Sequence, residues 1–135
     1  MPFPLLRSVF RREQKKNFIL ALLNEISANL EKYLVIEQRQ FITMDFEVQA
    51  WEEARHFTSV DFAPEVEEYA REVERFNAAF ADCRAFEEHY SSSIDQKTRA
   101  NAEVLHAKKE ALLEQFNVIR PKIEAAQKAV RAMLS

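Results

Sequence analysis

The chain contains no glycine among its 135 residues. Average usage of about 7% would give about nine. Because glycine is the default residue at positive φ, tight hairpin turns lose their usual residue, and the sequence is poorly suited to sheets. The same absence excludes phosphate-binding loops, dinucleotide fingerprints and nucleophile elbows, which all need glycine at fixed positions. Such a chain is suited to long helices joined by a few loops.

Apolar residues recur every three to four positions along most of the chain, which is typical of helices with one buried face. The hydrophobic fraction of 47% and the length of 135 residues provide for one core. We therefore predict an all-α fold, an up-and-down antiparallel bundle of three long helices and one short helix. The longest apolar run covers only residues 18–23, whereas a membrane span needs about 20 residues. The N-terminus also lacks the features of a signal peptide.

The first two helices are expected over residues 5–38 and from Thr43 or Asp45, either of which can cap a helix, to residue 56. Trp51 is expected beside the buried face of the short helix. That face carries Phe46, Ala50, Ala54 and Phe57, and the stripe of the first helix carries Phe18, Ile19, Leu22, Leu23, Ile26, Leu30, Tyr33 and Leu34.

The third and fourth helices are expected over residues 64–90 and from Ser93 to the end, with Pro64 at a favourable first position. Ser93 and Gln96 form a capping box. The apolar register continues across Pro121, so we expect a bend there rather than an end. The third helix has a coiled-coil-like seam of Val66, Tyr69, Val73, Phe76, Phe80 and Cys83, and the stripe of the fourth carries Leu105, Leu112, Phe116, Ile119, Ile123, Ala126, Val130 and Met133.

The charge is distributed unevenly, although the net charge is only −3. Residues 1–16 carry five basic side chains and one acidic side chain, a balance of +4, and the remaining 14 basic and 21 acidic side chains give −7. We interpret residues 1–16 as a basic amphipathic N-terminal arm, or the start of the first helix, and residues 17–135 as the helical bundle domain. Membrane or partner contact is expected through Phe3, Arg7, Phe10, Arg11, Arg12, Lys15 and Lys16. The alternative is that residues 3–10 fold onto the bundle and that the basic groups are solvated.

Two Glu-x-x-His sequences are the strongest signs of chemistry. Glu53 with His56 and Glu103 with His106 fall on the second and fourth helices, as in di-metal carboxylate bundles that act as oxidases or metal stores. Glu25 and Glu72 are candidate partners on the other two helices. Helical phase places Glu103 about 160° from Leu105 and therefore toward solvent. We accordingly expect no catalytic, cofactor or metal site and keep the di-metal bundle as the alternative function.

Other polar residues have structural interpretations. Cys83 is the only cysteine, which excludes an internal disulfide and favours a buried structural thiol. His89 lies near a helix C-terminus, where the helix dipole favours a cation. Asn29, Asn77 and Asn101 lie on or near seams, where a polar side chain either fixes register or is solvated.

Three short pieces carry a resemblance. They are Leu22-Leu23-Asn24-Glu25-Ile26-x-x-Asn29, then Phe41-x-Thr43 leading to Ala50-Trp51-Glu52, and Tyr69 followed by Asn77. Together they resemble a group of small uncharacterised bacterial helical proteins. Members of that group often have an N-terminal membrane helix before a soluble helical domain, and this sequence departs from them because it has no span. The resemblance implies a juxtamembrane role for the basic N-terminus, or an anchor upstream, and it implies no activity.

The sequence as a whole predicts a non-enzymatic helical interaction or scaffold module. Its partner is expected to be a protein or a second copy, with a membrane surface as a further option at the N-terminus. Nucleic acid is not expected, because the acidic body would oppose binding. The expected location is cytoplasmic or membrane-proximal. A third hypothesis places a partner helix in a groove between the second and fourth helices, lined by Trp51 and Phe57.

Overall fold

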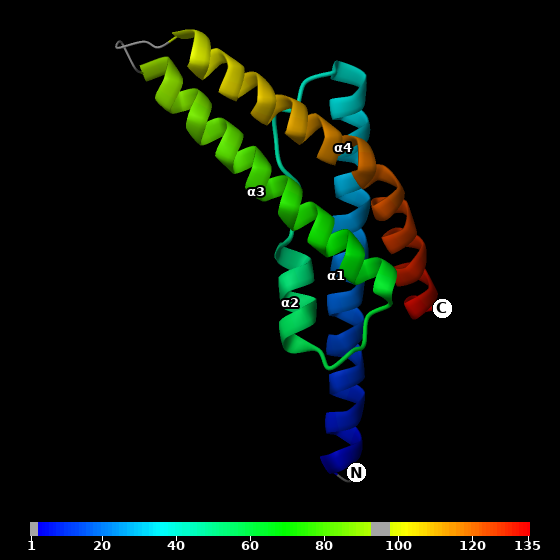
Figure 1. The fold of residues 1–135 in the computed structure, drawn as a ribbon. Helices are drawn as coiled ribbons and strands as arrows, with labels where there is room; N and C mark the ends of the chain where they lie inside the picture. The colour runs from blue at the N-terminus through cyan, green and yellow to red at the C-terminus, as the bar shows by residue number, and fades with distance from the viewer. Residues whose placement is uncertain (1–2, 93–97) are drawn as a thin grey trace.

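The computed structural model describes residues 3–92 and 98–135, and their side chains over 11–89 and 100–135. It contains α1 (Phe3–Arg39), α2 (Gln49–Phe57), α3 (Pro64–Ser92) and α4 (Thr98–Leu134), with no strand in these ranges. The four helices run alternately up and down (Figure 1). The predicted all-α antiparallel bundle of three long helices and one short helix is therefore confirmed. None of these helices, over the residues described, is long and apolar enough to cross a bilayer.

The core forms where the predicted stripes meet. α4 packs against both α3 and α1, and α2 packs against α1. A close ring stack joins α1 to α4, because the centroids of Tyr33 and Phe116 lie 4.2 Å apart. The side chains that are less than 2% exposed include Leu22, Ile26, Val66, Tyr69, Val73, Phe76, Ile119, Ile123 and Val130, all of which lie on the predicted stripes.

The start of the short helix was predicted wrongly. Residues 41–48 are not helical, and α2 begins at Gln49, so neither Thr43 nor Asp45 caps a helix. α1 ends because Gln40 adopts a left-handed conformation with φ of 62°, while its N–H donates to the carbonyl of Ile36 at 2.8 Å. The chain then runs in an extended course to α2 (Figure 1).

The buried face of the short helix also differs from the prediction. Phe46 is buried but lies before α2, and Phe57 is 67% exposed, with its ring stacked on Phe18. Trp51 is not at the edge of a seam but is only 4% exposed, and its ring packs edge-on against Phe62. The buried residues of α2 are therefore Trp51 and Ala54.

α4 passes through Pro121 without a break. Proline has no N–H to donate to the carbonyl of Asn117, which is a standard cause of a bend in a helix. Figure 1 shows that the axis of α4 bends in its orange part. The expected continuation past Pro121 is confirmed, and the predicted capping box of Ser93 and Gln96 lies outside the described residues.

Candidate functional site

The most specific polar arrangement in the fold is a pair of asparagine side chains that hold the extended segment from both sides. Asn77 on α3 accepts from the N–H of Phe46 and donates to the carbonyl of Phe46, both at 2.9 Å. Asn29 on α1 makes the same pair of bonds with Glu47, also at 2.9 Å. Successive residues of an extended chain direct their backbone groups to opposite sides. Each amide therefore takes the place of a neighbouring strand, and we call this arrangement the amide clamp.

Asn29 is completely buried and is also bonded to α3. Its Nδ2 donates to the hydroxyl of Tyr69 at 2.7 Å, which joins α1 directly to α3. Burial is the main reason that the pKa of Tyr69 is raised, so the phenol stays neutral. Both N–H groups of Asn29 and its oxygen have partners, and a buried amide without them would be costly.

Glu25 lies one turn before Asn29 on the same face of α1 and caps α2. Its two carboxylate oxygens accept from the N–H groups of Ala50 at 2.8 Å and Trp51 at 3.0 Å. The residue that precedes α2, Val48, has no side-chain oxygen that could do this. A carboxylate at a helix N-terminus satisfies free N–H groups and interacts favourably with the helix dipole.

The surroundings of Glu25 shift its pKa in opposite directions. Burial is the largest effect on its pKa and raises it, and the nearby carboxylates of Glu47 and Glu53 act in the same direction. The two backbone hydrogen bonds lower the pKa, but the net direction is upward. Glu25 is therefore a partly buried structural acid, and both of its oxygens are already occupied by α2.

The residues of the predicted di-metal site are not brought together. Glu103 and His106 lie exposed on α4, and His106 pairs with Glu110 at 3.0 Å. Glu72 pairs with Arg75 on α3, while Glu25 is engaged with α2. Across residues 11–89 and 100–135, no group of three or more His, Cys, Asp or Glu side chains is placed to hold a metal ion.

The other single residues have structural positions. Cys83 is buried on the α3 seam, and burial raises the pKa of its thiol. His89 lies exposed in the last turn of α3, and Asn101 is half-buried on α4. Asn77 is half-buried and belongs to the amide clamp. Of the two alternatives for this residue, it is not simply solvated, because its side chain bonds the backbone of Phe46.

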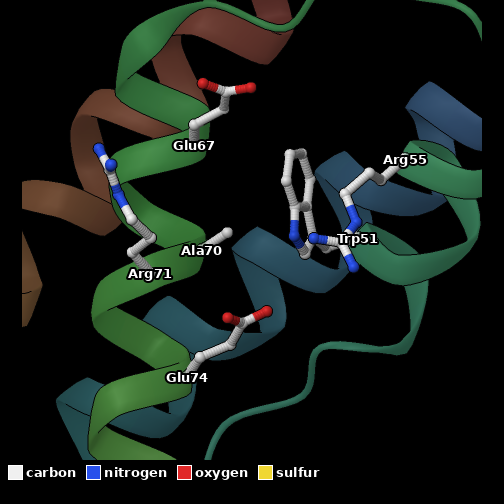
Figure 2. A pocket seen from close by; sticks show the side chains of 6 residues that line it. All are labelled: Trp51, Arg55, Glu67, Ala70, Arg71 and Glu74. Carbon is white, nitrogen blue, oxygen red and sulfur yellow. The ribbon is translucent and has the colours of Figure 1, made fainter.

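A shallow pocket lies between α2 and α3, not between α2 and α4 as the third hypothesis expected. Its volume is about 180 Å³, and Phe57 does not line it. Figure 2 shows Trp51 of α2 facing Ala70 of α3. The lining residues are Trp51, Arg55, Glu67, Ala70, Arg71 and Glu74.

The N-terminal arm is the first part of α1 and not a separate element, because the helix is continuous from residue 3 onward. It projects beyond the lower ends of α2 and α4 (Figure 1). Arg11, Arg12, Lys15 and Lys16 are all exposed. Phe3, Arg7 and Phe10 lie in the first turns of α1, and their side chains fall outside the described part.

Sequence reasoning identified the residues of the clamp without their roles. Glu25, Asn29, Tyr69 and Asn77 all belong to the pieces that carry the resemblance, and the sequence places Asn29 and Asn77 on or near seams, where a polar side chain either fixes register or is solvated. The available signal was that Glu25 and Asn29 are one turn apart beside Leu22 and Ile26. Comparisons with protein-family models, curated proteins and solved structures give no match for this chain.

Proposed function

We propose that this chain is a non-enzymatic helical interaction module whose docking element is the N-terminal arm, residues 1–16. The observation that carries the proposal is the projection of α1 beyond the bundle, which leaves residues 11–17 exposed (Figure 1). Three polar side chains inside the bundle support it as well, because they are engaged within the chain. Glu25, Asn29 and Asn77 are all bonded to backbone groups of the chain itself.

The charges on the arm have no partners within the described part of the chain. Among those residues, Arg11, Arg12, Lys15 and Lys16 make no ion pair within 4 Å. In the bundle, by contrast, seven of the twelve described lysines and arginines lie within 4 Å of a carboxylate: Lys32, Arg55, Arg75, Lys108, Lys109, Arg120 and Lys122. The arm therefore presents its positive charge to something other than this bundle.

The register of the arm also differs from that of the bundle. At about 100° per residue, the apolar positions 3, 6, 9 and 10 share an arc of about 120°, and position 5 lies with the basic positions 7, 11, 12, 15 and 16 on the opposite side. Ile19, Leu22 and Ile26, which are buried farther along α1, fall on the basic side. Four of the five apolar positions from 3 to 10 thus lie off the stripe that the bundle covers, which favours an external partner.

A partner for this arm must present negative charge. That chemistry is offered by an acidic protein surface and by anionic lipid headgroups, and the second source would make the location membrane-proximal. Nucleic acid is disfavoured, because the body of the protein is itself acidic.

The test compares the full chain with a variant that lacks residues 1–12, and with the double variant Arg11→Gln/Lys15→Gln. A matched control is Lys128→Gln/Arg131→Gln, which removes two exposed charges from the last turns of α4. Each variant is assayed for binding to vesicles with and without phosphatidylserine and for self-association by sedimentation velocity. Each basic residue near an anionic surface contributes about 1 kcal/mol, so the double variant should lose about 2 kcal/mol of binding free energy. If both variants and the control behave alike in both assays, the arm is not the docking element.

A further inference from the structure

The bundle has an acidic face that complements the arm. Five carboxylates on α2, on the connection after it and on the first half of α3 make no ion pair within 4 Å to any described residue. Four of them are exposed and Glu53 is half-buried. In contrast, Glu52 on α2 and Glu68 on α3 are paired with Arg55 and Lys122. The five are Glu53, Asp61, Glu65, Glu67 and Glu74.

At about 100° per residue, Glu65 lies about 160–180° around α3 from Glu67 and Glu74. Glu53 likewise lies about 160° around α2 from Trp51. The acidic face therefore consists of Glu67 and Glu74, which flank Ala70 on the side that faces Trp51.

The pocket beside Trp51 is lined by both residues of this face. Glu67 and Glu74 lie one turn on either side of Ala70, and Figure 2 shows their carboxylates on the side that faces Trp51. The guanidinium of Arg71 is turned away from Trp51 in the same view. Arg55 also lines the pocket, but it is paired with Glu52 at 2.9 Å. The charged groups that face the indole without an ion-pair partner in the described part of the chain are therefore the carboxylates of Glu67 and Glu74.

The size of the pocket limits what it can take. Sites for small molecules usually enclose about 300–1,000 Å³, and this one has about 180 Å³. It is suited to one long side chain from another protein surface. An aromatic ring between two carboxylates favours a cation, because the ring face and both acids attract positive charge.

The arm of the same molecule cannot supply that cation. It continues α1 as a helix and points away from α2 and α3 (Figure 1). A second copy of the chain can supply it, since each copy carries both a basic arm and an acidic face. If one arm lies on the partner's face, a twofold axis places the partner's arm on the first face and closes the assembly.

We propose that two copies of this chain form a closed dimer in which each arm lies on the acidic face of the other copy. One basic side chain of the arm enters the pocket between Trp51 and the carboxylates of Glu67 and Glu74. This inference rests on the proposed function of the arm and names its partner as a second copy.

The test is a charge exchange between the two surfaces, measured by sedimentation velocity up to about 1 mM protein, which covers weak association. One variant is Arg11→Glu/Lys15→Glu, and the other is Glu67→Lys/Glu74→Lys. These four residues are exposed, and circular dichroism checks that the fold is retained. The unchanged chain should dimerise, and high salt should weaken the dimer because the pairs are exposed.

Each variant alone should associate at least about tenfold more weakly than the unchanged chain. An equimolar mixture of the two variants should recover the dimer. In the mixed dimer, the acidic arm of one variant meets the basic face of the other, and the unchanged arm of the second meets the unchanged face of the first. The control Lys128→Glu/Arg131→Glu should dimerise like the unchanged chain. This mutual rescue would not follow from a general loss of stability.

Three results would overturn the inference. They are a monomer at all concentrations, a dimer that ignores both reversals, and an open series of larger species. The vesicle assay separates this failure from that of the proposed function. A monomer whose arm still binds anionic vesicles would remove the dimer and leave the arm as docking element, with lipid as its partner. A monomer that binds neither would remove both proposals.

Discussion

The side-chain amide of Asn29 on α1 donates a hydrogen bond to the hydroxyl of Tyr69 on α3, at 2.7 Å. The two residues are forty positions apart, and each is essentially inaccessible to solvent. The same amide holds both backbone groups of Glu47. One side chain therefore connects α1, the extended segment and α3.

Replacing Asn29 with alanine should remove that connection. The variant leaves the N–H and carbonyl of Glu47 and the hydroxyl of Tyr69 without their partner, and each such group costs about 1–3 kcal/mol when it stays buried. We expect the free energy of unfolding, measured with urea, to fall by about 2–4 kcal/mol. Asn24→Ala is the matched control, because Asn24 is exposed on the same helix, and its effect should stay within about 0.5 kcal/mol. Equal losses in the two variants would contradict the clamp.

Replacing Glu25 with alanine should loosen α2 in particular. The change leaves the N–H groups of Ala50 and Trp51 uncapped, and loss of a cap costs about 0.5–2 kcal/mol. Amide hydrogen exchange over residues 50–57 should accelerate more than exchange in α4. Glu52→Ala serves as the control, since Glu52 bonds only to Arg55 in the same helix. Uniform acceleration across all helices would argue against a local capping role.

The raised pKa of Glu25 sets a direction for the dependence of stability on pH. An acid whose pKa is higher in the folded protein than in the unfolded chain contributes stability that is complete below the unfolded pKa. That contribution is lost as the pH rises through the folded pKa. Relative to Glu25→Gln, which does not titrate, the unchanged chain should therefore lose stability as the pH rises through this window. Urea titrations of both proteins at several pH values measure the difference, and an opposite trend would show that the hydrogen bonds outweigh burial.

Gln40 should be replaceable by glycine with a gain in stability. Its φ of 62° lies in the left-handed region, which costs a residue with a side chain about 1–2 kcal/mol relative to glycine. Part of that gain is offset by the greater freedom of glycine in the unfolded chain. Thermal unfolding of Gln40→Gly should show a net stabilisation of about 0.5–1 kcal/mol. Gln38→Gly, two residues earlier and within α1, should instead destabilise the protein by about 1 kcal/mol.

The core of α4 allows a direct check of the packing. Ile123 is completely buried, whereas Val118 on the same helix is 50% exposed. Ile123→Ala should lower the free energy of unfolding by about 2–5 kcal/mol, because it removes buried methyl groups and leaves a cavity. Val118→Ala should change it by less than about 1 kcal/mol. Comparable effects from both variants would mean that α4 is turned differently about its axis.

Sequence periodicity was sufficient for the long helices. The 3-4 spacing of Val66, Tyr69, Val73 and Phe76 follows from the geometry of one helix packed on others, and all four side chains are buried. The start of α2 could not be found in this way. Thr43 and Asp45 are good caps by local rules, but the cap of α2 is Glu25, more than twenty positions earlier. Local rules consider only neighbours in the chain, and the contact that decides here comes from another helix.

The sequence likewise predicted only part of the candidate site, which consists of the N-terminal arm and the pocket beside Trp51. The charge asymmetry that defines the arm is visible in the sequence, and the exposure of Arg11 and Lys15 agrees with it. The sequence predicted a groove lined by Trp51 and Phe57 between the second and fourth helices, whereas the pocket beside Trp51 lies between α2 and α3. Only the fold shows that Trp51 faces Ala70.

The amide clamp has a consequence for the order in which the molecule assembles. Its bonds join positions 18, 31 and 40 residues apart in the chain. The two asparagines can hold the extended segment from both sides only when α1 and α3 are both in place, and closing such loops has an entropic cost that comes before any gain. The segment from Phe46 to α2 should therefore be the last part of the protein to fold. During unfolding under native conditions it should be the first to separate, before the helices on either side of it lose their protection.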